Sequence, residues 1–189
     1  MSTSDSARAV RIRPATMEDV PAVARIHIAS WQTAYRGILP DEFLDQMMDR
    51  LPNRIARWEE GMRNPESPGF ATFVAEHPTA GIIGFVSGGA VRQGRDGFRG
   101  ELGGIYLLAE HRRCGLGRRL FATCVEHLRT LGHVDMMLWV LEANHAARRF
   151  YEAMGGRVIA GARMETTLGG QKMLEIAYGW RPLPSTSHP

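Results

Sequence analysis

A run of arginines and glycines in the second half of the chain has the residue types that hold a phosphate group. The run is Arg112-Arg113-Cys114-Gly115-Leu116-Gly117-Arg118-Arg119, and it follows the apolar stretch Gly103-Gly104-Ile105-Tyr106-Leu107-Leu108 after a short loop. Glycines let backbone amides approach a ligand closely, and the first amides of a helix have no partner inside that helix. The helix dipole adds positive potential there, and arginine side chains bind phosphate oxygens with two donors. The segment therefore predicts a phosphate site at a helix start.

Two other phosphate-binding motifs can be compared with the same segment. The pattern GxxxxGK[ST] is absent from the sequence, so a P-loop is excluded. The dinucleotide pattern GxGxxG matches at Gly115 and Gly117 but has Leu120 in place of the third glycine. Asp135 lies at the distance of that pattern's ribose-binding acid, which keeps a nicotinamide-dependent oxidoreductase as an alternative. A plain helix start with solvated arginines is the simpler structural alternative.

The elements around this segment follow from the periodicity of apolar residues. Strand patterns cover residues 9–13, 70–76, 81–91, 101–108, 134–141, 157–165 and 172–180. The helical patterns are a helix capped by Thr16 and closed by Gly37, a stretch reaching about Met62 that Pro52 interrupts, residues 115–131, and a helix that Asn144 caps and Gly155-Gly156 closes. The order β-α-α-β-β-β-α-β-α-β-β implies an α/β fold, with a mixed sheet and helices on both of its faces.

Length and composition limit the class of protein. A chain of 189 residues fits one domain, which we expect to span residues 1–180, with residues 181–189 as a disordered tail. Its 44% hydrophobic and 23% charged residues are ordinary for a globular protein. The net charge of +3 does not predict a nucleic-acid partner. Of the 23 basic residues only Lys172 is a lysine, and arginine cannot act as a catalytic base because it does not deprotonate.

Cysteine, histidine and apolar patterns exclude further classes. Cys114 and Cys124 form no CxxC pair, so neither a disulfide framework nor a zinc ribbon is expected. The seven histidines have no HExxH or other metal spacing, and we expect no metal. No apolar run approaches the roughly 18 residues of a membrane span, so we expect a cytoplasmic protein without a membrane partner. The chain is expected to act as a monomer or a homodimer.

The arginine-glycine segment also carries a family resemblance. Arg112-x-x-Gly115-x-Gly117, preceded by Ile105-Tyr106-Leu107, resembles the (Q/R)xxGx(G/A) signature of the GNAT superfamily of acetyl-CoA-dependent N-acetyltransferases. The later stretch from Leu138 through Asn144 and Tyr151 to Gly155 resembles that family's second motif, with its Asn and Tyr seven residues apart. The resemblance covers roughly residues 10–178, and it implies a GNAT-like mixed, mostly antiparallel sheet with helices on both faces.

The resemblance implies where the co-substrate acetyl-CoA would bind. Its contacts would come from the backbone of Ile105, Tyr106 and Leu107 and from the loop residues Arg112, Arg113, Cys114, Gly115, Leu116, Gly117 and Arg118. In the family, the amide that corresponds to Leu107 polarises the thioester carbonyl. Asn144 resembles the family's cofactor-contacting asparagine, and it could serve as a helix cap at the same time.

The resemblance also implies catalytic and acceptor-binding residues. Tyr151 corresponds to the tyrosine that protonates the departing CoA thiolate, although a tyrosine on this stripe could simply pack in the core. Glu101 lies where some members carry a glutamate that takes the proton of the amine, and it shares a strand face with Leu107 if no bulge intervenes. Trp31 and Tyr35 lie where members build the acceptor pocket, or else they pack in the core.

The expected function is therefore transfer of an acetyl group from acetyl-CoA to a primary amine, with both substrates bound together. The acceptor could be a small molecule or a peptide. A non-catalytic acyl-CoA-binding module or sensor is the alternative from a different class. Cys114 stands where the family usually has a small residue. A covalent acetyl-cysteine would need a histidine partner that orders the thiol, and we expect Cys114 to be a plain loop cysteine.

Overall fold

The computed structural model describes residues 9–65, 67–92 and 97–185. Its strands are β1 (Arg11–Pro14), β2 (Ala71–His77), β3 (Gly81–Ala90), β4 (Gly100–Leu107), β5 (Met136–Leu141), β6 (Arg157–Leu168) and β7 (Gln171–Trp180). Its α-helices are α2 (Val20–Ala34), α3 (Asp41–Asp45), α4 (Leu51–Arg63), α5 (Leu116–Thr130) and α6 (His145–Ala153). Part of the predicted turn before β4, residues 93–96, lies outside the described residues.

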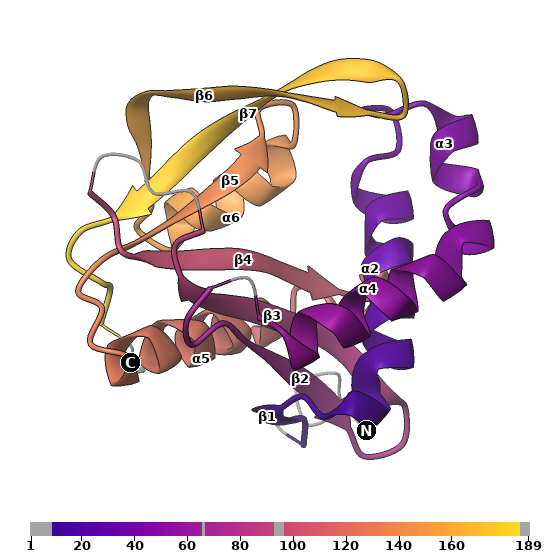
Figure 1. The fold of residues 1–189 in the computed structure, drawn as a ribbon, viewed down its shortest axis with the longest axis horizontal. Coiled ribbons are helices and arrows are strands. Elements are labelled where there is room, and N and C mark those ends of the chain that lie inside the picture. Colours follow the sequence, from indigo (N-terminus) through magenta and orange to yellow (C-terminus); the bar gives the residue numbers. More distant parts are fainter. Residues whose placement is uncertain (1–8, 66, 93–96, 186–189) are drawn as a thin grey trace.

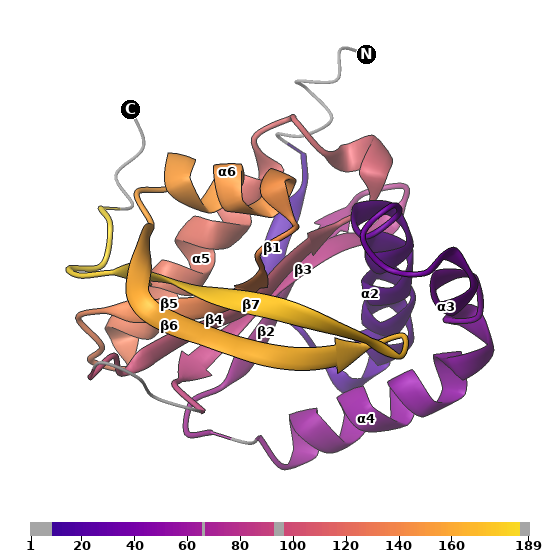
Figure 2. The ribbon, with the colours of Figure 1, turned by 90° about the horizontal axis from the view of Figure 1, so that it is seen from above.

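The seven strands form one sheet in the order β1-β2-β3-β4-β5-β7-β6. Neighbouring strands are antiparallel except β4 and β5, which are parallel. Helices α5 and α6 cover one face of the sheet, while α2 and α4 lie on the other (Figures 1 and 2). The predicted mixed, mostly antiparallel sheet with helices on both faces is confirmed.

The stretch predicted as one helix interrupted at Pro52 is divided differently. It consists of α3, a short 3-10 turn at Met48–Arg50, and α4, in which Pro52 is the second residue. Proline has no amide hydrogen to donate, but the first turn of a helix has no acceptor for that hydrogen anyway. Pro52 therefore helps to begin α4 and does not interrupt it.

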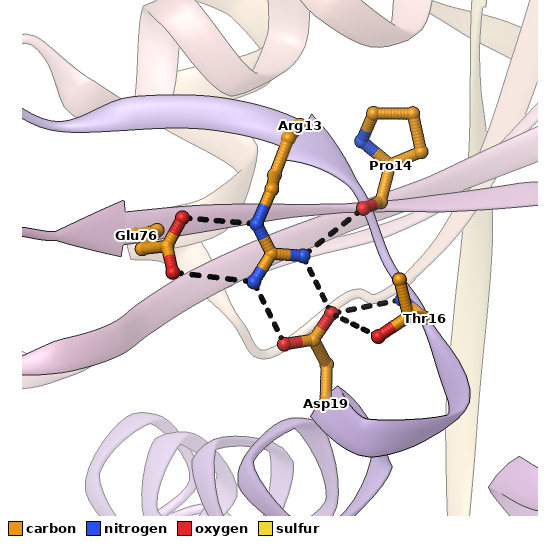
Figure 3. A network of polar contacts seen from close by, with 5 residues as sticks. All are labelled: Arg13, Pro14, Thr16, Asp19 and Glu76. Carbon is orange, nitrogen blue, oxygen red and sulfur yellow. Dashed lines mark hydrogen bonds and ion pairs between the residues drawn. The ribbon is translucent and has the colours of Figure 1, made fainter.

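A network of charged side chains fixes the start of α2 (Figure 3). Arg13 on β1 donates to both carboxylate oxygens of Asp19, at 2.6 and 2.9 Å, and to Glu76 on β2 at 2.9 Å. Asp19 also accepts from the Thr16 amide at 2.8 Å, as the predicted cap requires. The hydrogen bonds from Arg13 lower the pKa of the Asp19 carboxyl. This network holds α2, which carries Trp31 and ends at Tyr35, against the sheet.

The parallel strands β4 and β5 separate soon after they begin. Within these fully described strands, pairing is limited to Gly100 with Met136 and Glu101 with Met137. Farther along, β5 rises away from β4 (Figure 1). The backbone groups on the facing sides of the two strands therefore have no strand partner there, which opens a gap through the sheet.

A β-bulge in β4 decides which side chains face which side of the sheet. The register with β3 passes from Gly88–Leu102 to Ser87–Gly104, so Gly103 is an extra residue without a partner on β3. Leu102 packs in the core with α5, and after the bulge Leu107 also packs against that core, whereas Tyr106 packs with α2. Glu101 and Leu107 were predicted to share a face only if no bulge lay between them. Because the bulge at Gly103 does lie between them, they face opposite sides of the sheet.

The hairpin of β6 and β7 extends toward α2 and α3 (Figures 1 and 2). Gly169 and Gly170 form its two-residue turn with φ values of 57° and 78°, a left-handed conformation that favours glycine. A Cβ atom at Gly169 would lie 2.8 Å from the Phe43 ring, so the turn packs closely on α3. Leu168 packs with the cluster around Ile28 and Leu44. The hairpin tip is thus held over the end of α2.

The segment expected to begin a disordered tail is partly packed. Leu183 is buried, and its amide donates to the Val134 carbonyl at 2.8 Å. Arg129 donates to the Pro184 carbonyl. The packed chain therefore continues past the predicted boundary at Trp180, while residues 186–189 lie outside the described residues. In the described part of the chain, none of the helices has the length and apolar character that crossing a membrane requires.

His27 on α2 is a histidine inside a cluster of aromatic rings. Its ring centroid lies 4.5 Å from that of Tyr106 and 5.9 Å from that of Trp58. Both ring nitrogens are buried, and neither has a hydrogen-bond partner among the described residues. Burial, followed by the charges of Arg54 and Arg57, lowers the pKa of His27 from 6.5 to about 3. His27 is therefore neutral in the folded protein at neutral pH.

Replacing His27 with phenylalanine should make the fold more resistant to acid. Between pH 6.5 and about 3 the unfolded chain protonates this histidine and the folded protein does not, so the free energy of unfolding decreases as the pH falls through that window. The His27→Phe variant lacks this loss, so its Tm should fall less than the wild-type Tm between about pH 7 and pH 5. Calorimetry at several pH values measures the difference. His145→Gln, at an exposed position on α6, is the control, and equal slopes for wild type and His27→Phe would contradict the prediction.

Candidate functional site

The gap between β4 and β5 is part of a cleft of about 920 Å³. Residues from both faces of the sheet line it, with Tyr151 and Phe150 from α6 on one side and, on the other, Trp31 from α2 and Tyr35 directly after it. The predicted site residues that line this cleft are Trp31, Tyr35, Glu101, Ile105, Tyr106, Leu107, Arg112, Arg113, Gly115, Gly117, Arg118, Asn144 and Tyr151. The fold thus brings together residues from α2, β4, the start of α5 and the loop before it, and α6.

The glycine loop, residues 112–117, has the backbone geometry of an anion site. Arg113 and Gly115 have φ values of 62° and 83°, and this alternation of left-handed residues turns successive amides toward one point. Helix α5 begins at Leu116, and the amides of Arg118 and Arg119 donate to the Gly115 carbonyl. The amides of Gly115, Leu116 and Gly117 have no backbone acceptor among the described residues. They are available to a ligand at the positive end of the helix.

Side chains tie this loop to the end of β4. The Leu107 carbonyl accepts from Arg112 Nε at 3.1 Å and from Ser30 Oγ at 3.2 Å. The Leu108 amide donates to the Ile83 carbonyl on β3 at 3.1 Å. Backbone groups alternate sides along a strand, so the Leu107 amide points away from β3 and into the gap toward β5. The gap therefore contains an amide donor beside the anion site.

Helix α6 brings Asn144 and Tyr151 to the opposite wall. Asn144 Oδ1 accepts from the Ala147 amide at 3.1 Å, which confirms its predicted role as a helix cap. Tyr151 packs among aromatic rings, with its ring centroid 5.5 Å from that of Phe150 and 6.2 Å from that of Trp180. Its hydroxyl has no hydrogen-bond partner in the part of the chain that the structure describes. Tyr151 is thus both packed in the core and exposed to the cleft.

Burial keeps the Tyr151 phenol protonated. Its pKa is raised well above 10, first by burial and then by the nearby Tyr106 and Tyr35 phenols. At neutral pH the hydroxyl is therefore neutral and carries a proton that it can donate. A proton donor without a competing partner is suited to protonate a group that becomes negative during a reaction.

Glu101 lines the cleft and forms an ion pair with Arg92. One carboxylate oxygen accepts from the Arg92 amide at 2.8 Å, and the other accepts from Nε of the same arginine at 3.1 Å and from its Nη2. Glu101 is 6% exposed. Arg92 also stacks over the Phe70 ring. The role of Glu101 as a base stays a prediction. Arg92 already binds both oxygens of its carboxylate.

Aromatic side chains line the part of the cleft next to α2. The ring centroids of Trp31 and Tyr35 are 4.8 Å apart, and Tyr106 lies over Gly104, where a Cβ would approach its ring to 2.8 Å. Burial raises the pKa of the Tyr35 hydroxyl, with the neighbouring Tyr106 phenol and Glu175 carboxylate acting in the same direction. Trp31 and Tyr35 thus line the cleft and also pack against each other.

Two predicted binding residues contribute no side chain to the cleft. Leu116 is 1% exposed and packs in the core beneath α5, so only its backbone faces the loop. The Cys114 thiol donates to the His111 carbonyl at 3.1 Å and does not line the cleft. Neither side chain is therefore placed to contact a ligand in this cleft.

Residues that were not predicted from the sequence also line the cleft, among them Ser30, Arg92 and Glu175. Glu175 did leave a signal, because it is a single charge in the apolar strand sequence Met173-Leu174-Glu175-Ile176-Ala177. Ser30 and Arg92 left none, because their contacts depend on how distant elements pack. In the described ranges, no group of histidine, cysteine, aspartate and glutamate side chains could hold a metal ion.

Comparisons with known proteins identify a family and a fold for this chain. The model of the acetyltransferase (GNAT) family matches residues 27–156. An uncharacterized N-acetyltransferase of Bacillus subtilis, YuaI, is 33% identical over 174 residues, covering 92% of this chain and 94% of that protein. A spermidine N(1)-acetyltransferase of Thermoplasma acidophilum is 22% identical and covers 89% of this chain and 98% of its own length. The structure of yncA from Salmonella typhimurium, solved with its cofactor acetyl-CoA, has a TM-score of 0.63 at 24% identity and covers 92% of this chain and 94% of that one.

Proposed function

The chain belongs to the GNAT family of acetyltransferases, and from this premise we propose that it transfers an acetyl group from acetyl-CoA to a primary amine. One observation carries the proposal. The anion site of the glycine loop, the free Leu107 amide and the protonated Tyr151 hydroxyl all face a single cleft through the sheet. A phosphate-bearing acyl donor needs this combination of groups.

The residues that are present fit acetyl-CoA. The amides of Gly115, Leu116 and Gly117 would hold the pyrophosphate, with Arg112, Arg113 and Arg118 around it. A Cβ at Gly117 would lie 3.4 Å from Phe150 and 3.7 Å from Leu107, so this glycine stands where the loop, β4 and α6 meet. In this proposal the pantetheine arm enters the gap between β4 and β5 beside the backbone of Ile105 and Leu107. Asn144 would contact it from the opposite wall.

The proposed chemistry uses groups of the protein on both sides of the gap. The Leu107 amide donates to the thioester oxygen, which becomes more negative as the amine attacks. The amine nitrogen forms a bond to the carbonyl carbon while the carbon–sulfur bond breaks. Tyr151 gives its proton to the departing sulfur, and a proton from the nitrogen restores the phenol. The proton donor contributes about 10² to 10⁴ in rate, and the fixed approach of the two substrates contributes much of the rest.

The acceptor would approach from the α2 side of the cleft. Trp31 and Tyr35 form the wall there, and Leu168 of the packed hairpin tip covers the end of the space. This shape favours a small molecule or a single chain end over the surface of a folded protein. Because one relative is a spermidine N(1)-acetyltransferase, polyamines are one class of acceptor to test.

A screen for thiol release tests the proposed function. Purified protein is mixed with acetyl-CoA and with polyamines, aromatic amines, amino acids or short peptides, and free CoA thiol is followed with a chromogenic reagent. We expect release only in the presence of an amine, together with an N-acetylated product by mass spectrometry. Tight binding of acetyl-CoA without turnover for any amine would support an acyl-CoA-binding module in place of an enzyme.

A further inference from the structure

Glu175 brings a carboxylate into the cleft from the strand β7. It pairs in register with Leu141 on β5 and with Met164 on β6. Ile176 and Tyr178 pack in the core with α5, so Glu175 points to the opposite face, together with Ala177. This is the face of α2, where Trp31 and Tyr35 line the same cleft. Glu175 therefore lies on the acceptor side of the gap.

The two carboxylates of the cleft differ in their partners. Glu101 is held by the Arg92 backbone amide and guanidinium. Glu175 has neither a hydrogen bond nor an ion pair with its side chain in residues 9–65, 67–92 and 97–185. Burial raises its pKa above the ordinary value of 4.5. A half-buried carboxylate without a partner needs a cation, and a pKa above the ordinary value makes it a stronger base.

The groups that face Glu175 fit a cation. The Tyr35 phenol, directly after α2, and the Tyr106 phenol on β4 are close enough for the Glu175 charge to raise both of their pKa values, although burial is the larger cause for each. Leu141 and Met164 flank it on the neighbouring strands. Aromatic faces attract an ammonium group, and a carboxylate completes the charge balance. Tyr151 lies beside the same two phenols, so a cation at Glu175 is also near the proposed acid.

We propose that Glu175 binds the ammonium group of the acceptor and takes a proton from it before the amine attacks, an inference that rests on the acetyl transfer proposed above. The ammonium nitrogen loses one proton to the Glu175 carboxylate and becomes a neutral nucleophile. Its lone pair forms the carbon–nitrogen bond as the carbon–sulfur bond breaks, with Tyr151 protonating the sulfur. The second proton of the nitrogen returns to Tyr151, and Glu175 releases the first to water. The acceptor class is a compact primary amine that carries no carboxylate beside the amino group, because such a carboxylate would repel Glu175.

The test measures kcat/KM against pH for the most active amine of the screen. Glu175→Gln should lower kcat/KM about 10²-fold near neutral pH. Its rate should recover as the pH rises, because more of the amine then arrives deprotonated. Glu165→Gln is the matched control, since Glu165 is on the neighbouring strand with an exposed side chain and pairs with Lys172. It should keep the wild-type profile. Calorimetry should give Glu175→Gln the wild-type affinity for acetyl-CoA.

A second measurement requires no turnover. With a non-reactive CoA thioether bound, the amine should raise the Tm of the wild type, and Glu175→Gln should lose this shift. A Glu175→Gln variant with the wild-type pH profile and the wild-type amine shift would overturn the proposal, and so would loss of acetyl-CoA binding. If Glu101→Gln, and not Glu175→Gln, lowers kcat/KM near neutral pH and regains it as the pH rises, the base is Glu101. If the wild type binds acetyl-CoA but acetylates no amine, the proposed function itself fails. That failure appears in the wild type, whereas failure of the Glu175 proposal appears only when the variants are compared with an active wild type.

Discussion

Replacing Gly117 with aspartate should abolish binding of acetyl-CoA while leaving the fold intact. The amide of Gly117 lies in the first turn of α5 and has no backbone acceptor in the described residues. A carboxylate there would repel the pyrophosphate and occupy the space that the phosphate needs. Loss of charge-assisted hydrogen bonds worth about 1.5–3 kcal/mol each corresponds to a decrease in affinity of about 100-fold or more when two are lost. Calorimetry of acetyl-CoA binding measures this effect.

The fold should tolerate this change. Gly117 has no left-handed backbone conformation, and a Cβ would make contacts of 3.4 Å or longer with Phe150 and Leu107. Aspartate near a helix start also stabilises the helix. Gly117→Asn is the matched control, because it adds a side chain of the same shape without the charge. If Gly117→Asp binds acetyl-CoA as tightly as the wild type does, the anion site has been assigned to the wrong loop.

Tyr151→Phe should lower kcat by about 10²-fold or more and leave the affinity for acetyl-CoA nearly unchanged. The change removes the proton that the thiolate needs and keeps the ring that packs against Phe150 and Trp180. No partner in the described chain loses a hydrogen bond when the hydroxyl is removed. Steady-state kinetics with the best amine and calorimetry with acetyl-CoA separate the two effects.

The matched control for Tyr151→Phe is Tyr178→Phe. Tyr178 is fully buried, and its hydroxyl donates to Glu152 and accepts from Arg148 at 3.2 Å, away from the cleft. Its loss should lower the Tm and change kcat little. A thioester of a more acidic thiol should also recover part of the rate in Tyr151→Phe, because its leaving group needs less protonation. Wild-type kcat in Tyr151→Phe, with chemistry limiting the rate, would leave Tyr151 with packing as its only role.

The parts of the site that depend on local sequence could be predicted. Gly115 marks the turn into α5 because a left-handed residue before a helix favours glycine, and Asn144 marks the start of α6 because its side chain caps the helix. Tyr151 follows from helical spacing along the same helix. These features need only a few neighbouring residues, so spacing in the sequence is enough to place them.

The parts that depend on how distant strands pair could not be predicted. The bulge at Gly103 exists only in the register of β4 against β3, and it moves Glu101 to the face opposite Leu107. The Arg92–Glu101 ion pair and the position of Glu175 beside Tyr35 depend likewise on the order of β4, β5 and β7 in the sheet. A single strand pattern contains no information about that order. The sequence therefore predicted Glu101 as the base, whereas the carboxylate in the cleft without a partner among the described residues is Glu175.

The most direct test of the account is one quenched reaction in which three quantities are measured together. The protein is mixed with acetyl-CoA and with the best amine of the screen, and free thiol, N-acetylated amine and the mass of the intact protein are followed over time. Direct transfer predicts that free thiol and acetylated amine appear in equal amounts, that neither product appears when acetyl-CoA or the amine is left out, and that the protein mass stays unchanged. Thiol release without amine, together with a protein heavier by one acetyl group that the amine then removes, would contradict direct transfer in this cleft.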